Sequence, residues 1–136
     1  MNARTVARRA VVGAGTLAGV AALVLGGGGV ASAETAQSTV WSKNCSGTLM
    51  TTYLAGSAGW QVRNYVNNTS GSTTCSGWID WAERGDTSHY TGLNQRVWVD
   101  PGRSQESLSM PDNSPALARV CVQANGDNTA RCSAWW

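Results

Sequence analysis

The sequence predicts an all-β fold, a small antiparallel β-sandwich with two disulfides, for which a small β-barrel is the alternative. Three observations predict this class. Beyond residue 33 the chain is rich in Ser, Thr, Asn, Gly, Val and Trp and has few strong helix formers, a composition typical of strands and turns. Seven or eight short segments with strand patterning lie between clusters of turn residues. All four cysteines also lie beyond residue 33.

The first 33 residues have the three parts of an export signal. Three arginines give a cationic start, an apolar stretch covers 10–30, and residues 31–33, Ala-Ser-Ala, supply the small side chains that a signal peptidase accepts. We expect cleavage before Glu34, leaving a single secreted, extracellular β domain over residues 34–136. The alternative is a retained membrane anchor, which the Ala and Gly content and the cleavage site disfavour.

Charge excludes two classes of partner. Removal of the signal takes three of the ten basic residues, so the remaining domain has a net charge of about −1 at neutral pH. It has no basic patch and no polybasic run. We therefore expect neither nucleic acid nor, after signal removal, a membrane as a partner.

The clearest predicted strand covers residues 60–66, where side chains alternate between a buried and a wet face. The alternation places Trp60, Val62 and Val66 in the core and Tyr65 outside. A turn is predicted at 100–102, Asp-Pro-Gly. The other predicted strands are 47–54, 75–83, 95–100, 105–110, 116–124 and 129–135, with a weaker one at 39–42.

The last predicted hairpin selects the disulfide pairing. If residues 125–128, Asn-Gly-Asp-Asn, form the loop, Ala124 faces Thr129 and Cys121 faces Cys132. In a non-hydrogen-bonded pair the two Cα atoms are about 4.5 Å apart, which a disulfide can span. We therefore predict Cys121–Cys132 and, by elimination, a second disulfide between Cys45 and Cys75.

Catalytic and metal-binding motifs are absent from the sequence. The single histidine, His89, follows Ser88 directly, and in an extended strand their side chains would diverge. The chain has no Gly-x-Ser-x-Gly elbow and no Cys-x-x-Cys pair. The acidic residues Asp80, Glu83 and Asp86 are interpreted as solvated surface charge. We expect no enzymatic activity, no cofactor and no metal.

Aromatic residues provide the candidate binding surface. Trp98 shares a strand face with Arg96, opposite two valines, and Tyr65 shares one with polar neighbours, so both rings are candidates for an outer surface. The terminal pair, Trp135 and Trp136, either closes the core or forms a contact surface. These five residues are the predicted binding set.

Three functions are compatible with these features. The first is a non-enzymatic module that binds carbohydrate, a cell-wall polymer or an extracellular protein through exposed aromatics. The second is an inhibitor of an extracellular hydrolase, which would use the loop 110–115 stiffened by Pro111 and Pro115. The third is a structural cell-surface protein.

The Ala/Gly-rich signal and stapled β domain resemble small secreted proteins of actinomycete-type bacteria, a group that includes protease and amylase inhibitors. The chain lacks the Cys-Pro-Met and Trp-Arg-Tyr strings of such inhibitors, and its cysteine spacing differs. No functional residue is transferred from that group.

Overall fold

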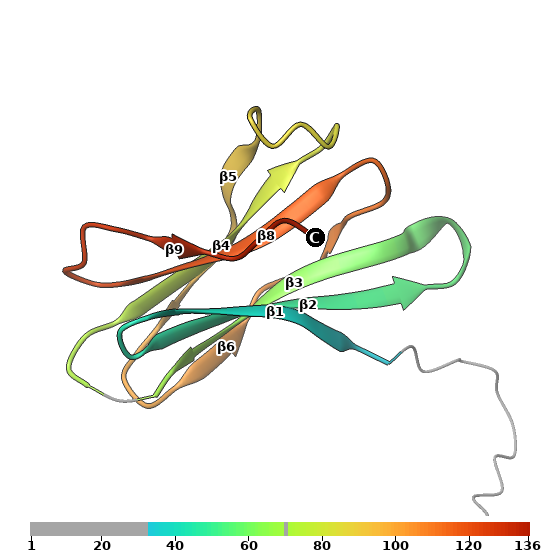
Figure 1. Ribbon diagram of the computed structural model, residues 1–136. Coiled ribbons are helices and arrows are strands. Elements are labelled where there is room, and N and C mark those ends of the chain that lie inside the picture. Colours follow the sequence, from blue (N-terminus) through green and yellow to red (C-terminus); the bar gives the residue numbers. More distant parts are fainter. Residues whose placement is uncertain (1–32, 70) are drawn as a thin grey trace, which may run out of the picture.

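The computed structural model describes residues 33–69 and 71–136, so the predicted export signal lies outside the described residues except for Ala33. Two antiparallel sheets pack face to face (Figure 1). The first sheet has the order β1-β2-β3-β6, with β7 also paired to β3. Its strands are β1 (Thr35–Ser42), β2 (Cys45–Leu54), β3 (Gly59–Asn68), β6 (Ser104–Glu106) and β7 (Met110–Pro111).

The second sheet has the order β5-β4-β8-β9. Its strands are β4 (Cys75–Ala82), β5 (Thr91–Val99), β8 (Leu117–Ala124) and β9 (Arg131–Cys132). The predicted sandwich is confirmed, and the sheets do not close into a barrel. No helix in the described part of the chain is long and apolar enough to cross a membrane.

The core lies between the sheets and consists of inward-facing side chains that alternate with outward-facing ones. Val62 and Val66 point inward from β3, as predicted, and meet Ile79 of β4 and Val120 of β8. The sheets approach most closely at Gly77, where an added Cβ would lie 2.3 Å from a methyl carbon of Val66. Glycine is therefore required at this position.

Both predicted disulfides are present. Cys45 and Cys75 are fully buried and join β2 to β4, so this bond connects the two sheets through the core. Cys121 and Cys132 lie opposite each other in β8 and β9, with Cα atoms 4.0 Å apart. The loop count that placed this pair in register is confirmed.

Three strand boundaries differ from prediction because pairing partners override local sequence signals. The strand predicted at 95–100 begins at Thr91, since β4 pairs with this segment despite positive φ angles at Leu93 and Gln95. The strand predicted at 105–110 is divided into β6 and β7, because Ser107 bonds to the backbone of Asn64 between them. The strand predicted at 129–135 is regular only over β9.

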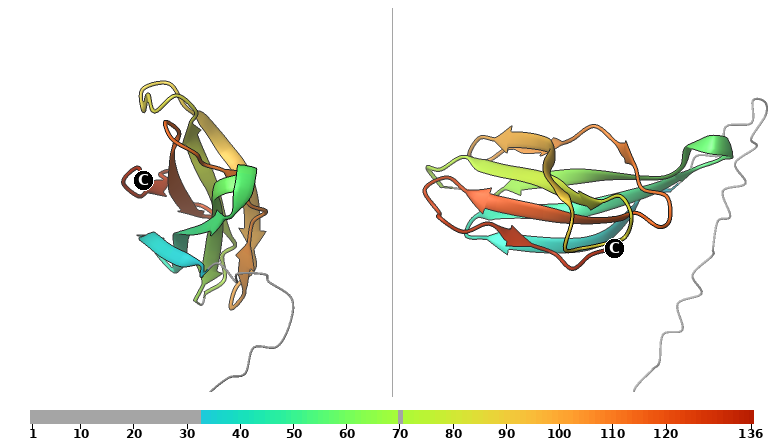
Figure 2. Two further views of the ribbon diagram at one scale, coloured as in Figure 1. Left: turned by 90° about the vertical axis from the view of Figure 1, so that its right-hand side faces the viewer. Right: turned by 90° about the horizontal axis from the view of Figure 1, so that it is seen from above.

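The β2–β3 hairpin projects beyond the second sheet at one end of the sandwich (Figure 2). The hairpin turn contains a short 3-10 helix, η1 (Gly56–Ala58). Trp60 lies at this end of β3 and is 41 % exposed. The prediction that Trp60 belongs to the core is therefore wrong: its parity is that of Val62, but the second sheet does not cover this end of the strand.

Candidate functional site

The outer surface of the second sheet is the candidate site. Because β4 sends Gly77 and Ile79 inward, the intervening Trp78 points outward, as does Trp98 on β5. We call this surface the Trp98 face and define it by the outward side chains of β4, β5 and β8. Its members are Ser76, Trp78, Asp80, Arg96, Trp98, Arg119 and Gln123.

Arg96 holds the exposed edge of this face together. Its guanidinium carbon lies 4.2 Å from the centroid of the Trp98 ring and 5.5 Å from that of Trp78. Its Nη2 also donates a hydrogen bond of 3.3 Å to Ser76 Oγ. Both indoles therefore contact one cation, which attracts the negative faces of their rings. Trp98 remains 55 % exposed, whereas Trp78 is buried beneath the guanidinium.

Asp80 organises the other half of the face. The carboxylate accepts hydrogen bonds from Arg119 at 2.8 and 3.0 Å and from the indole nitrogen of Trp78 at 3.0 Å. Asp80 is only 4 % exposed, so its interpretation as solvated surface charge is wrong. The sequence concealed this burial because the two partners come from other strand positions. One of its oxygens also contacts the sulfur of Cys121.

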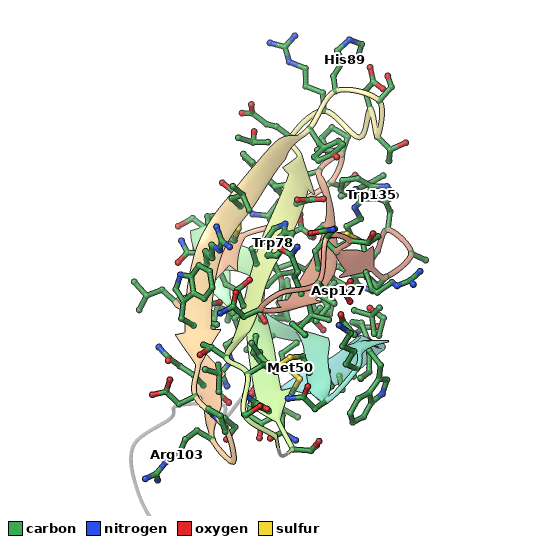
Figure 3. The ribbon with its side chains drawn as sticks, turned by 90° about the vertical axis from the view of Figure 1, so that its left-hand side faces the viewer. Met50, Trp78, His89, Arg103, Asp127 and Trp135 are labelled. Atoms are coloured by element: carbon green, nitrogen blue, oxygen red, sulfur yellow. A yellow bond between two sulfur atoms is a disulfide. The ribbon has the colours of Figure 1, made fainter. Side chains whose placement is uncertain are left out.

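Trp135 belongs to the same face. The guanidinium of Arg119 lies 4.6 Å from the Trp135 ring and 5.0 Å from the Tyr90 ring, and the two rings meet edge to face. Trp135 is half-buried there. Figure 3 shows it on one side of Trp78, with Asp127 nearby in the loop after β8. A chain of alternating cations and rings therefore crosses the sheet.

A small polar hollow lies beside Trp98. It has a volume of about 90 Å³ and is lined by Trp98, Ser76, Gln123 and the loop residues 124–127. The loop is fixed, because Gln123 Nε2 donates to Asp127 O at 2.6 Å and the Asp127 carboxylate accepts from Ser42 Oγ at 3.3 Å. Sequence reasoning did not identify the loop as part of a site, because its Asn-Gly-Asp-Asn string is an ordinary turn signal.

Two of the five predicted binding residues lie elsewhere. Tyr65 is half-buried on the outer surface of the first sheet, opposite Thr48 of β2 and Glu106 of β6. Trp136 packs against the core and meets Trp60 edge to face at 5.5 Å. The structure therefore brings Arg96, Trp98 and Trp135 onto one face and separates Tyr65 and Trp136 from them.

The β4–β5 loop contains a serine, a histidine and an aspartate in contact. Contrary to the expected divergence, the turn brings Ser88 Oγ to 3.0 Å and Asp86 Oδ2 to 2.8 Å from His89 Nδ1. Hydrogen bonds from Ser88 and His89 lower the pKa of Asp86 to about 2. A catalytic triad needs serine and aspartate on opposite ring nitrogens. Here both meet one nitrogen in a fully exposed loop, remote from Trp78 and Asp127 (Figure 3), so this geometry cannot relay a proton.

One group of potential metal ligands is already occupied by other bonds. Atoms of Asp80, Cys121 and Cys132 lie within 4.8 Å of one another. The two sulfurs are joined in a disulfide, and the carboxylate is paired with Arg119. These atoms therefore lack the free thiolates that a metal would require.

The loop proposed for an inhibitor is tied to the hairpin rather than extended into solvent. Asp112 donates its backbone N–H to Trp60 O at 2.9 Å, and Asn113 Oδ1 accepts from Trp60 N at 2.8 Å. Asp112 itself is buried, and Pro111 lies at the end of β7. Only Asn113, Ser114 and Pro115 of this loop's second half are exposed.

Comparison of the chain with family models, with curated proteins and with solved structures finds no significant match.

Proposed function

We propose that the protein is a secreted, non-enzymatic module that binds carbohydrate, such as a cell-wall or environmental polysaccharide, through the Trp98 face. The single observation that carries this proposal is an exposed indole, fixed by Arg96, beside a polar hollow. A sugar ring presents an apolar C–H face and a rim of hydroxyls. The indole fits the first and the hollow fits the second.

The geometry of the hollow supports recognition of hydroxyl groups. Ser76, Gln123, Asn125 and Asp127 supply hydroxyl, amide and carboxylate groups around it. The hollow is small, so it fits one part of a sugar, with the rest of a polymer lying across the open face. Because Arg96 and the loop contacts hold the site in place, little ordering is needed on binding.

The export part of the proposal is supported by two kinds of observation. The sequence of residues 1–33 has the order of charged, apolar and small residues that a signal requires. Two disulfides in the described residues are consistent with an oxidising compartment outside the cytoplasm. Mass spectrometry of the protein from culture medium tests this part, with Glu34 expected as the first residue.

Binding is tested by sedimentation with insoluble polysaccharides such as cellulose, chitin and purified cell wall. We expect the wild type to be retained on at least one polymer and Trp98→Ala to be depleted from that pellet at least about tenfold less, because stacking on a ring is lost. The matched control is Trp41→Ala, since Trp41 has the same exposed fraction, 55 %, on the first sheet. Absence of retention on every polymer, or equal loss in both variants, would contradict the proposal.

A further inference from the structure

A second hollow lies at the end of the sandwich where the β2–β3 hairpin projects. It has a volume of about 240 Å³, and its walls include Trp60, Trp136, Pro115 and Leu117. The two indoles meet edge to face with centroids 5.5 Å apart. We call this hollow the indole cavity. It is separate from the Trp98 face, because Trp60 belongs to the first sheet and Trp136 packs against the core.

Asp112 also lines the indole cavity. It is only 4 % exposed, and its Oδ1 accepts a hydrogen bond of 3.1 Å from the indole nitrogen of Trp81. Its other oxygen, Oδ2, is buried and has no hydrogen-bond partner among the described residues. A buried carboxylate oxygen without a donor is costly. The cavity therefore contains a specific acceptor for a donor that this part of the chain does not supply.

We propose that the indole cavity is a binding site for a small primary amine with an apolar body, whose ammonium group pairs with Asp112. The ammonium would donate to Oδ2 and lie near the faces of Trp60 and Trp136, which attract cations. Pro115 and Leu117 would contact the apolar body. The volume is below the range of about 300 to 1,000 Å³ that is typical of sites for larger ligands, so the ligand is a small monoamine.

The walls of the cavity are fixed before any ligand binds. Asp112 and Trp60 are joined through the backbone at 2.9 Å, and Asn113 Oδ1 closes a second bond to Trp60 N. Trp136 exchanges two backbone hydrogen bonds with Ala118, at 2.9 and 3.2 Å. A preformed cavity loses little affinity to ordering on binding. A small ligand can then bind measurably despite its few contacts.

The test is a titration of the purified protein with phenethylamine, followed by the indole N–H resonances in proton–nitrogen spectra. The matched probe is phenethyl alcohol, which has the same ring and chain length but no charge. We expect saturable shifts at Trp60, Trp81 and Trp136, and binding of the alcohol that is at least about tenfold weaker, because only the amine forms a charge-assisted bond. Equal affinity for the two probes would overturn the proposal.

Two variants separate this site from the Trp98 face. Asp112→Asn removes the charge with little change of shape and should weaken amine binding about tenfold or more, leaving alcohol binding unchanged. Trp98→Ala should leave amine binding unchanged, even though it abolishes the proposed retention on polysaccharide. If Asp112→Asn fails to fold, the amine–alcohol comparison in the wild type decides. Absence of saturable amine shifts would mean that Oδ2 is satisfied by water alone, and the proposal would be rejected.

Discussion

Arg96 lies over Trp98 with its guanidinium carbon 4.2 Å from the ring centroid. This contact links local sequence to the proposed function, because the two residues share one face of β5 at a spacing of two positions. The same cation covers Trp78 and bonds to Ser76. Arg96 therefore fixes an exposed ring that would otherwise rotate freely, and it does so from the strand that carries that ring.

Replacement of Arg96 by alanine tests this orienting role. We expect Arg96→Ala to weaken retention on the bound polysaccharide several-fold and to lower the free energy of unfolding by about 1 kcal/mol, the worth of partly exposed cation–π contacts. Sedimentation isotherms and urea unfolding measure the two effects. Arg131→Ala is the control, since Arg131 is an exposed arginine on the same sheet without a ring contact among the described residues. Unchanged retention by Arg96→Ala would show that Trp98 needs no support.

Asp80 is the residue of the Trp98 face on which stability depends most. Asp80→Ala leaves the guanidinium of Arg119 and the indole nitrogen of Trp78 without their buried acceptor. We expect the free energy of unfolding to fall by about 3 to 5 kcal/mol, and by less for Asp80→Asn, which keeps an acceptor oxygen. Urea unfolding measures both variants. Glu83→Ala, at an exposed site, should change stability by no more than about 0.5 kcal/mol; a similar value for Asp80→Ala would contradict the buried network.

The two disulfides should contribute unequally. Cys45–Cys75 closes a loop with a sequence separation of 30, and Cys121–Cys132 one of 11. The chain-entropy relation gives about 4 and about 3 kcal/mol for their removal. The first also leaves a cavity between the sheets, because both its cysteines are fully buried. Urea unfolding of the two double Cys→Ala variants should therefore show the larger loss for Cys45 and Cys75, and the reverse order would refute this assignment.

The fold was predictable because its main signals are local. Alternation in β3 placed Val62 and Val66 correctly, and a count along one hairpin paired Cys121 with Cys132. The failures arise where distant segments meet. Trp60 has the parity of a core residue but lies beyond the end of the opposite sheet, and this depends on the relative lengths of strands from different parts of the chain.

The candidate site was predictable only in part, for the same reason. Trp98 and Arg96 are on one strand, so alternation alone placed them together. Asp80 became a buried acceptor only through Arg119, 39 positions along the chain. Likewise, no local pattern indicates that the buried carboxyl of Asp112 bonds to Trp81, because a Pro-Asp-Asn string is also typical of an exposed turn.

The burial of Asp112 predicts a pH dependence of stability. Burial raises the pKa of this carboxyl from 3.8 to about 6, and the hydrogen bond from Trp81 offsets part of the rise. Between these values the folded protein retains a proton that the unfolded chain has lost. The contribution of Asp112 to stability is therefore full below about pH 4 and is lost as pH rises through 6, by at most about 3 kcal/mol. Urea unfolding between pH 3.5 and 8 measures this dependence.

Asp112→Asn isolates this contribution because the amide does not titrate. Asp86 acts in the opposite direction, since its pKa is lowered to about 2, and its contribution is lost as pH falls. It is present in both proteins, so it cancels in their difference. We expect the stability of the wild type relative to Asp112→Asn to decrease from pH 4 to 7 and then to level off. Parallel curves for the two proteins would show that Asp112 ionises as it does in the unfolded chain, and that its Oδ2 is solvated rather than buried without a donor.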